Sequence, residues 1–473
     1  MRFTILLLIL TLAAGLQAQS RRVSPSPNPK PSEPTTAAEL TVKQMFDEAN
    51  TYNKIKFAEY ETKKVPYSER LRLQTEREQK QMAAKYAAIA ATRTGLTGDD
   101  LYYLGLLHWI AENLDGTSDT LHKFLAASGI VPEKAQTARS IIAVIAAKQR
   151  KFDEALSVLA EYSKNLPIKL SERSRMESEI AKAYTAEKKI AEATPHAAEA
   201  YRFAKTILLD GGMSQRGLDE VLDTGMVLHE CHKTAGNIKE ADEELEDLRK
   251  TAAAVGSVSL YFYASDKLIT YRIETGRKPM GLETYLTSLI QAGRDLPTKT
   301  AQDDAIRQLK KREKQYKLLA EAAPELTNID QWFPGKPRTL LDMRGKVVLL
   351  DFWATWCGPC FDAFPSLAEW HRDLAADGLV ILGVTRYYGQ GDGFDLDNPN
   401  EIAFLKNFKL KYDLPYDFMV AKDQAAQQAY AATGLPTAVL IDRKGVIRYI
   451  ESGTNPSRIE EMRAMVLKLL AEK

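Results

Sequence analysis

A change in residue pattern near Pro324 is the feature that most constrains how this chain can fold. Over residues 39–323, apolar residues recur at three- and four-residue spacing, as at Leu101 and Leu104, which predicts packed α-helices. After Pro324, short apolar and β-branched runs alternate with helical segments, which predicts an α/β arrangement. The chain is therefore expected to be multidomain, with an all-α helical region followed by an α/β domain over residues 324–473.

The α/β domain is expected to contain one sheet with helices on both of its faces. Its strands begin parallel, and the last two form an antiparallel hairpin through the turn 442–445, which ends in glycine. The predicted strands cover residues 347–352, 379–384, 418–420, 438–441 and 446–450, and the predicted helices cover residues 359–374, 402–408, 424–430 and 459–471.

The first residues have the pattern of a secretory signal peptide. Arg2 precedes the apolar run 3–14, and the small residue Ala18 stands before a polar one, which predicts a signal over residues 1–18. The run is shorter than the roughly 20 apolar residues that span a bilayer; an uncleaved anchor is the alternative. Residues 19–38 contain five prolines and are expected to form a Pro-rich linker. We expect an exported protein, periplasmic or otherwise extracytoplasmic, that is soluble after signal cleavage and not a transmembrane protein.

The charge balance and the cysteine count exclude several classes of protein. Lysine and arginine number 64 and aspartate and glutamate number 63, so the basic excess typical of nucleic-acid-binding proteins is missing. Three cysteines are too few for a disulfide-stapled scaffold or a four-thiolate zinc site. Cys231 lies between His229 and His232, but a free cysteine usually behaves as a small buried residue. We predict no metal site there, and an intermolecular disulfide through Cys231 stays open.

Three helix breaks in the all-α region look related. They are the segments 151–155, 189–193 and 237–241, each of which joins a polar turn to a helix that opens with an acidic residue and alanine. Their spacing is near the period of helical-hairpin arrays, and the region over about residues 99–290 resembles a degenerate tetratricopeptide-type array. Such an array would offer a concave surface to a protein partner, whereas the alternative, an irregular bundle, would not. The charge run 240–250 is typical of a solvated helix face.

Two cysteines stand where the first predicted strand of the α/β domain ends and a helix begins. Cys357 and Cys360 flank Gly358 and Pro359, a spacing that lets the two thiols close a small disulfide ring. The helix N-terminus directs unpaired N–H groups and a positive dipole end at Cys357, which lowers its pKa and favours the nucleophilic thiolate. Cys360, one turn into the helix, is expected to be more buried and to attack second. Pro359 removes a backbone donor that the first turn leaves unpaired.

Asp351 precedes the two cysteines on the same predicted strand. Its neighbours along the strand are apolar, so its carboxylate is expected to be buried and its pKa raised. Such a carboxylate can take the proton from Cys360 as that thiol attacks. We therefore predict that Cys357 and Cys360 form a redox-active disulfide and that Asp351 is the third catalytic residue.

Together these residues resemble a known family. The segment 351–360 with Pro365 is similar to thioredoxin, and the wider domain over about residues 327–473 resembles the exported TlpA-like thiol-disulfide oxidoreductases. The TlpA-like features are the lead-in 326–346, the insert 387–399 and the segment 434–442. The resemblance implies a thioredoxin fold and a dithiol enzyme.

The resemblance also assigns substrate-binding roles. It implies that Pro436 is a cis-proline facing the dithiol and that Leu435 offers main-chain hydrogen bonds to a bound substrate, and we add Trp356 to this group. The active-site motif Gly358-Pro359 resembles reducing members of the family more than oxidising ones. The chain departs from many TlpA-like proteins after Cys360, because Phe361 and Ala363 stand where those proteins have a basic residue and a glutamate.

The sequence therefore predicts an exported protein disulfide reductase. The dithiol is the redox agent, and no metal, flavin or nicotinamide cofactor is expected. Its partners would be a substrate protein with a disulfide, an electron donor of the thiol-disulfide transfer class and a protein on the helical region. One alternative is a helical-repeat interaction or chaperone-like scaffold with an accessory redox domain. A peroxiredoxin-like peroxidase fits less well, because Leu350 and Ala354 replace the proline and threonine of its usual motif.

Overall fold

A computed structural model describes residues 39–96, 98–211 and 214–472 of the chain. The predicted signal peptide and Pro-rich linker lie outside the described residues. The chain divides into two compact units, one that ends at Ala241 and one that begins at Asp242. The first unit is helical, and the second combines helices with an α/β sheet domain. None of the helices in the described ranges has the length and apolar character required to cross a bilayer.

The first unit consists of α-helices joined by short loops. α1 begins with a capping box, in which the Thr41 side chain accepts from the N–H of Gln44 and the Gln44 side chain accepts from the N–H of Thr41, so two unpaired donors are satisfied. The helices are α1 (Val42–Thr62), α2 (Glu69–Ala91), α3 (Asp99–Ile110), α4 (Leu114–Leu125), α5 (Pro132–Lys148), α6 (Phe152–Lys164), α7 (Leu170–Ala186), α8 (Ile190–Gly211) and α9 (Gln215–Ala235).

The three related breaks fall between α5 and α6, between α7 and α8, and between α9 and α10 (Ile238–Val255). One residue with positive φ stands directly before each segment: Arg150, Lys188 or Gly236. At each break the next N–H donates to the carbonyl five residues back, at 2.9 Å, which is a common closing motif of helix C-termini. The shared sequence pattern therefore corresponds to a shared backbone conformation, while the tetratricopeptide-type repeat stays a prediction.

The prediction of a solvated face for the charge run 240–250 is wrong for two of its residues. Asp242 and Arg249 are buried. Asp242 accepts hydrogen bonds from Arg272 and Arg277 at distances between 2.7 and 3.0 Å. Charged residues can be buried where a partner of opposite charge meets them. The partners of Asp242 lie 30 and 35 residues further along the chain, which is too far for a local pattern to reveal them.

Helices also open the second unit and lead into the sheet domain. These helices are α10 from Asp242 onwards, α11 (Val258–Glu274), α12 (Lys278–Asp295) and α13 (Lys299–Leu318). The segment after α13 pairs with the last strand of the sheet: the N–H of Ala320 donates to the carbonyl of Ile447 at 2.8 Å, and the N–H of Ile447 donates to the carbonyl of Glu321 at 2.9 Å. This pairing covers a strand edge that would otherwise expose unpaired groups, and it ties α13 to the sheet.

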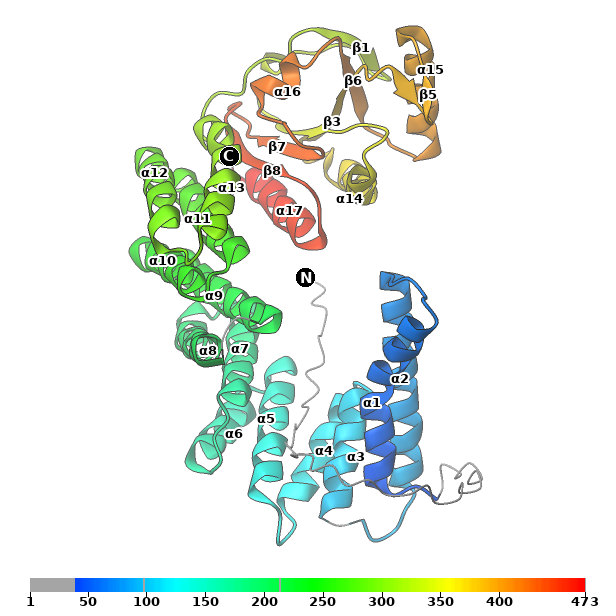
Figure 1. Ribbon diagram of the computed structural model, residues 1–473, viewed down its shortest axis with the longest axis vertical. Helices are drawn as coiled ribbons and strands as arrows, with labels where there is room; N and C mark the ends of the chain where they lie inside the picture. The colour runs from blue at the N-terminus through cyan, green and yellow to red at the C-terminus, as the bar shows by residue number, and fades with distance from the viewer. Residues whose placement is uncertain (1–38, 97, 212–213, 473) are drawn as a thin grey trace, which may run out of the picture. The chain divides into compact units, whose positions relative to one another are not determined.

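A six-stranded mixed sheet forms the centre of the α/β domain, in the order β1-β6-β3-β2-β7-β8 (Figure 1). β2, β3 and β6 run parallel, whereas β7 and β8 form the predicted antiparallel hairpin. β2 is buried along its whole length, as expected for a continuous apolar run in a central strand. The strands are β1 (Ile329–Phe333), β2 (Val347–Phe352), β3 (Leu379–Arg386), β6 (Asp417–Ala421), β7 (Thr437–Ile441) and β8 (Ile447–Ser452).

Helices cover both faces of this sheet, as predicted. α14 and α17 pack against the face that carries Leu349 and Ile381, and α16 lies on the other side of the sheet (Figure 1). Tyr430, which follows α16, packs against Phe352. Because strand residues alternate between faces, Asp351 shares the face of Leu349 and points towards α14 and α17. The helices are α14 (Gly358–Leu374), α15 (Asn398–Lys411), α16 (Ala425–Ala429) and α17 (Pro456–Ala471), with a 3-10 turn η1 (Leu341–Met343) before β2.

The domain also contains β1 and a small hairpin of β4 (Gln390–Gly391) and β5 (Phe394–Asp395), none of which the sequence predicts. β1 is an edge strand with exposed polar residues at Asp330 and Gln331, so it has no continuous apolar run. α15 begins at Asn398 rather than at residue 402, because the Asp397 side chain accepts from the N–H of Asn400 at 3.0 Å and caps the helix one turn earlier.

Candidate redox site

The two predicted redox cysteines lie together where β2 ends and α14 begins. Cys357 is the N-cap residue of α14, and Cys360 lies in its first turn. A disulfide joins them, with the Cα atoms 5.4 Å apart. The N–H of Cys360 donates to the carbonyl of Cys357 at 3.0 Å. When this pair is reduced, the Cys357 thiol stands at the positive end of a 17-residue helix, which favours its thiolate.

The dithiol is buried, but the residues next to it are exposed. Trp356 is 55% exposed, whereas Cys357 is 4% and Cys360 1% exposed. Gly358 and Pro359 are also exposed. Another molecule can therefore approach the dithiol along the Trp356–Pro359 rim, and Cys360 is the more buried of the two sulfur-bearing residues, as predicted.

Asp351 lies on β2 as a buried carboxyl group. Its neighbours in the sheet are Gly383 on β3 and Ala438 on β7, and it is 2% exposed. Its Oδ2 atom has no hydrogen-bond partner among the described residues. Burial raises the pKa of Asp351 to about 7, so this carboxyl group can take up and release a proton near neutral pH.

The loop before β7 brings Leu435 and Pro436 to the same part of the domain. The Leu435–Pro436 peptide bond is cis, as the resemblance implies. Pro436 is buried and lines a cavity together with Asp351, and its carbonyl accepts from the N–H of Gly453 at 2.7 Å. Leu435 packs against the core cluster that contains both cysteines. Of the predicted substrate-binding residues, Pro436 therefore faces the Asp351 side and Trp356 faces solvent.

Tyr388 is a residue of this region that the sequence analysis did not single out. Its ring lies 5.3 Å from that of Trp356 and nearly perpendicular to it, and the Arg386 guanidinium lies 4.1 Å from the Tyr388 ring centroid. Glu401 accepts from the N–H groups of Tyr388 and Gly389 at 2.8 and 2.9 Å. Tyr388 belongs to the insert 387–399, which the sequence marks only as a feature of the family resemblance, so its position between two predicted elements is the only clue to its role.

Trp356→Ala is expected to raise KM for a protein disulfide about threefold to tenfold, because an exposed aromatic contact contributes about 1 kcal/mol of binding. kcat is expected to stay within roughly twofold of the wild type, since no proton or thiol is removed. Steady-state insulin reduction measures both constants. Leu410→Ala, which truncates a 79% exposed side chain on α15, is the control. An unchanged KM in Trp356→Ala would remove this residue from the binding surface.

The third cysteine belongs to the first unit. Cys231 is buried and free, and burial raises the pKa of its thiol. His229 is buried beside it in α9, with its Nδ1 2.9 Å from the carbonyl oxygen of Ala241. Within residues 39–96, 98–211 and 214–472, no three histidine, cysteine, aspartate or glutamate side chains gather as metal ligands would.

Fold and site together define a class of protein: a thioredoxin-like domain that carries a dithiol at a strand-to-helix junction is a thiol-disulfide oxidoreductase. Comparisons with known proteins agree with this class. Residues 319–450 match the AhpC/TSA family. The chain is 32% identical over 144 residues to the thiol-disulfide oxidoreductase ResA of Bacillus thuringiensis subsp. konkukian, which is 30% of this chain and 75% of that protein.

A second curated relative and a solved structure also match. ResA of Bacillus subtilis is 32% identical over 120 residues, which is 25% of this chain and 60% of that protein. A crystal structure assigned to a thiol:disulfide interchange protein DsbE of Chlorobium tepidum is 30% identical and covers 32% of this chain and 98% of that chain, with a TM-score of 0.25. The chain belongs to the family of ResA-type thiol-disulfide oxidoreductases.

Proposed function

We propose that the protein is an exported reductase that opens disulfides in other proteins. The observation that carries the proposal is the pair Cys357 and Cys360 at the N-terminus of α14, with the buried carboxyl group of Asp351 on the preceding strand. In this proposal the dithiol is the redox agent, and the chain needs no metal, flavin or nicotinamide.

The proposed reaction has two thiol-disulfide exchanges. First, the Cys357 thiolate attacks a substrate disulfide, a mixed disulfide forms, and one substrate sulfur leaves and takes a proton from solvent. Second, Cys360 gives its proton to Asp351, and its thiolate attacks the sulfur of Cys357. The mixed disulfide breaks, the second substrate sulfur leaves as a thiolate that takes a proton from solvent, and Cys357–Cys360 becomes the disulfide. Two electrons pass to the substrate.

Substrate binding and the direction of electron flow are proposed from the residues around the dithiol. Trp356, Leu435 and Pro436 are proposed to hold the substrate chain beside Cys357. The Gly358-Pro359 motif resembles reducing members of the family, so we propose that electrons flow from the dithiol to the substrate. A donor of the thiol-disulfide transfer class must then return two electrons to the Cys357–Cys360 disulfide.

The proposed location is outside the cytoplasm. The support is Arg2 with the apolar run 3–14, which has the composition of a cleaved signal. In an oxidising compartment structural disulfides are common, so a reductase there has substrates. The helical region is proposed to bind a protein partner.

A scaffold function is the second candidate, favoured by the extent of the helices, which begin at Val42 and continue to Leu318. In that case the redox domain is accessory, and Cys357→Ser would leave the cellular role intact. A peroxidase function is the third candidate. It fits less well, because Leu350 and Ala354 stand where the peroxidase motif has proline and threonine. A direct assay of peroxide consumption separates it from disulfide reduction.

Cys360→Ser is expected to accumulate mixed disulfides with substrate proteins, because the second exchange has lost its nucleophile. Adducts should form through Cys357, migrate as high-mass species on non-reducing gels and disappear on reduction. The double variant Cys357→Ser/Cys360→Ser should form none. If folded Cys360→Ser protein captures no partner from the compartment in which it is found, the reductase proposal is wrong.

A further inference from the structure

Asp351 shares one row of the sheet with a second carboxyl group. Asp351 of β2 pairs with Ala438 of β7, and Ala438 pairs with Glu451 of β8. Paired residues on adjacent strands point to the same face, so only the methyl group of Ala438 stands between the two carboxyl side chains. The strand spacing places their Cα atoms roughly 10 Å apart.

A small cavity, lined by polar and apolar side chains, borders both carboxyl groups. Its lining includes Asp351, Ala438, Tyr449, Glu451 and Thr454. The Oδ2 atom of Asp351 and the hydroxyl groups of Tyr449 and Thr454 are buried and have no hydrogen-bond partner among the described residues. Because buried polar atoms are normally satisfied by protein or water, this lining suits a short hydrogen-bonded chain that leads from Asp351 to Glu451.

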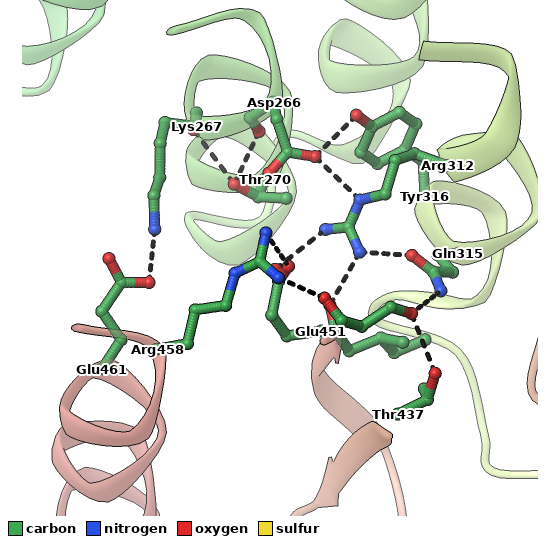
Figure 2. Close-up of polar contacts among 12 residues, drawn as sticks. Asp266, Lys267, Thr270, Arg312, Gln315, Tyr316, Thr437, Glu451, Arg458 and Glu461 are labelled. Carbon is green, nitrogen blue, oxygen red and sulfur yellow. Dashed lines mark hydrogen bonds and ion pairs between the residues drawn. The ribbon is translucent and has the colours of Figure 1, made fainter. Parts of the chain in front are cut away.

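Glu451 differs from Asp351 in its access to solvent and in its neighbours. Its side chain is 20% exposed, whereas Asp351 is 2% exposed. Arg312 of α13 lies 3.5 Å from one carboxylate oxygen of Glu451, and Arg458 of α17 lies 3.3 Å from the other (Figure 2). Burial raises the pKa of Glu451, and the two guanidinium groups oppose that rise.

Arg312 is itself held by the helices that precede the sheet domain. Its Nε donates to Asp266 of α11 at 2.9 Å, and its Nη1 donates to the carbonyl of Ile450 at 3.1 Å (Figure 2). The hydroxyl of Tyr316 donates to the same oxygen of Asp266 at 2.7 Å. The protonation of Glu451 therefore depends on side chains outside the sheet domain. The charged and titratable groups that face Glu451 are Arg312, Asp266, Lys267, Arg458 and Tyr449.

We propose that Glu451 is the outlet through which Asp351 exchanges its proton with solvent, and that Arg312 positions Glu451 for this transfer. The inference rests on the proposed function, in which Asp351 receives the proton of Cys360. That proton then moves through the cavity to the Glu451 carboxylate and on to bulk water, so only O–H bonds form and break. Helices α11 and α13 thereby control a step of the redox domain through one guanidinium group.

Glu451→Gln tests the outlet directly. The variant keeps the shape of the side chain but cannot carry the proton, so the single-turnover rate of mixed-disulfide resolution at pH 7 is expected to fall on the order of tenfold. Removal of one negative charge roughly 10 Å away should also lower the pKa of Asp351 by about half a unit to one unit. Rapid-quench kinetics with insulin measures the rate, and NMR titration of the Asp351 carboxyl carbon measures the pKa.

Three further variants separate the outlet from a structural effect. Ala438→Val narrows the cavity without changing any charge and should slow resolution as Glu451→Gln does. Arg312→Gln removes a cation, raises the pKa of Glu451 and should move the acid limb of the rate profile to higher pH. Lys468→Gln breaks the ion pair of α17 with Glu274 of α11, a contact between the same parts of the unit but away from the cavity, and should leave the profile in place.

The inference and the proposed function fail in different ways. If Glu451→Gln and Ala438→Val resolve the mixed disulfide within twofold of the wild-type rate, the outlet is overturned while the reductase stands. If the wild type does not reduce insulin at all, the proposed function fails, and the outlet, which rests on it, fails with it.

Discussion

Replacing Cys357 with serine is expected to lower kcat/KM for insulin reduction by on the order of a thousandfold or more. The thiolate at the N-terminus of α14 is the group that forms the first covalent bond. A serine hydroxyl does not ionise near neutral pH and cannot form a mixed disulfide with the substrate. The buried Cys360 cannot replace it, because that side chain is 1% exposed. Insulin turbidity with dithiothreitol as the donor measures the rate.

Cys231→Ala is the matched control for this prediction. Cys231 is also a buried cysteine, but burial raises the pKa of its thiol, and no helix N-terminus stabilises its thiolate. Its removal should leave kcat/KM within roughly twofold of the wild type. If Cys357→Ser keeps more than a tenth of the activity while Cys231→Ala loses it, the assignment of the nucleophile is wrong.

The sheet domain could be predicted from sequence wherever burial is continuous. β2 and β3 are buried central strands, so their apolar runs are long enough to stand out. β1 and the β4–β5 hairpin could not be predicted, because edge and loop strands carry polar side chains and are fixed by their pairing partner. The dithiol and Asp351 could be found because their chemistry is local: all three lie within ten residues of one another.

The contacts between α13 and the sheet domain, in contrast, could not be predicted from the sequence. Arg312 and Glu451 are 139 residues apart in the chain, and α13 is so rich in lysine and arginine that its sequence is typical of a solvated helix. The burial of Arg312 can be recognised only in the folded structure, where Asp266 and Glu451 lie beside it. Local periodicity therefore predicts that helices form, but it does not predict which charges they bury.

Asp351→Asn is expected to stabilise the protein at pH 8 by up to about 4 kcal/mol, because burial raises the pKa of Asp351 from 3.8 to about 7 and each pKa unit corresponds to about 1.4 kcal/mol. The folded state of the wild type binds the proton more tightly than the unfolded state. Its stability is therefore highest below pH 3.8, decreases as the pH rises to about 7, and is constant above that value with respect to this group. An asparagine carries no charge at any pH, so the variant lacks this decrease.

Urea unfolding from pH 4 to pH 8, followed by tryptophan fluorescence with the disulfide intact, measures the difference. Four of the five tryptophans lie in the sheet domain, at positions 332, 353, 356 and 370, so the fluorescence change reports on the part that contains Asp351. The two proteins should converge near pH 4 and diverge as the pH rises. Glu369→Gln, which neutralises an exposed carboxylate on α14, should follow the wild type at every pH. Parallel curves for Asp351→Asn and the wild type would mean that the Asp351 carboxyl group titrates as it does in water, and the proton acceptor for Cys360 would then have to be sought elsewhere.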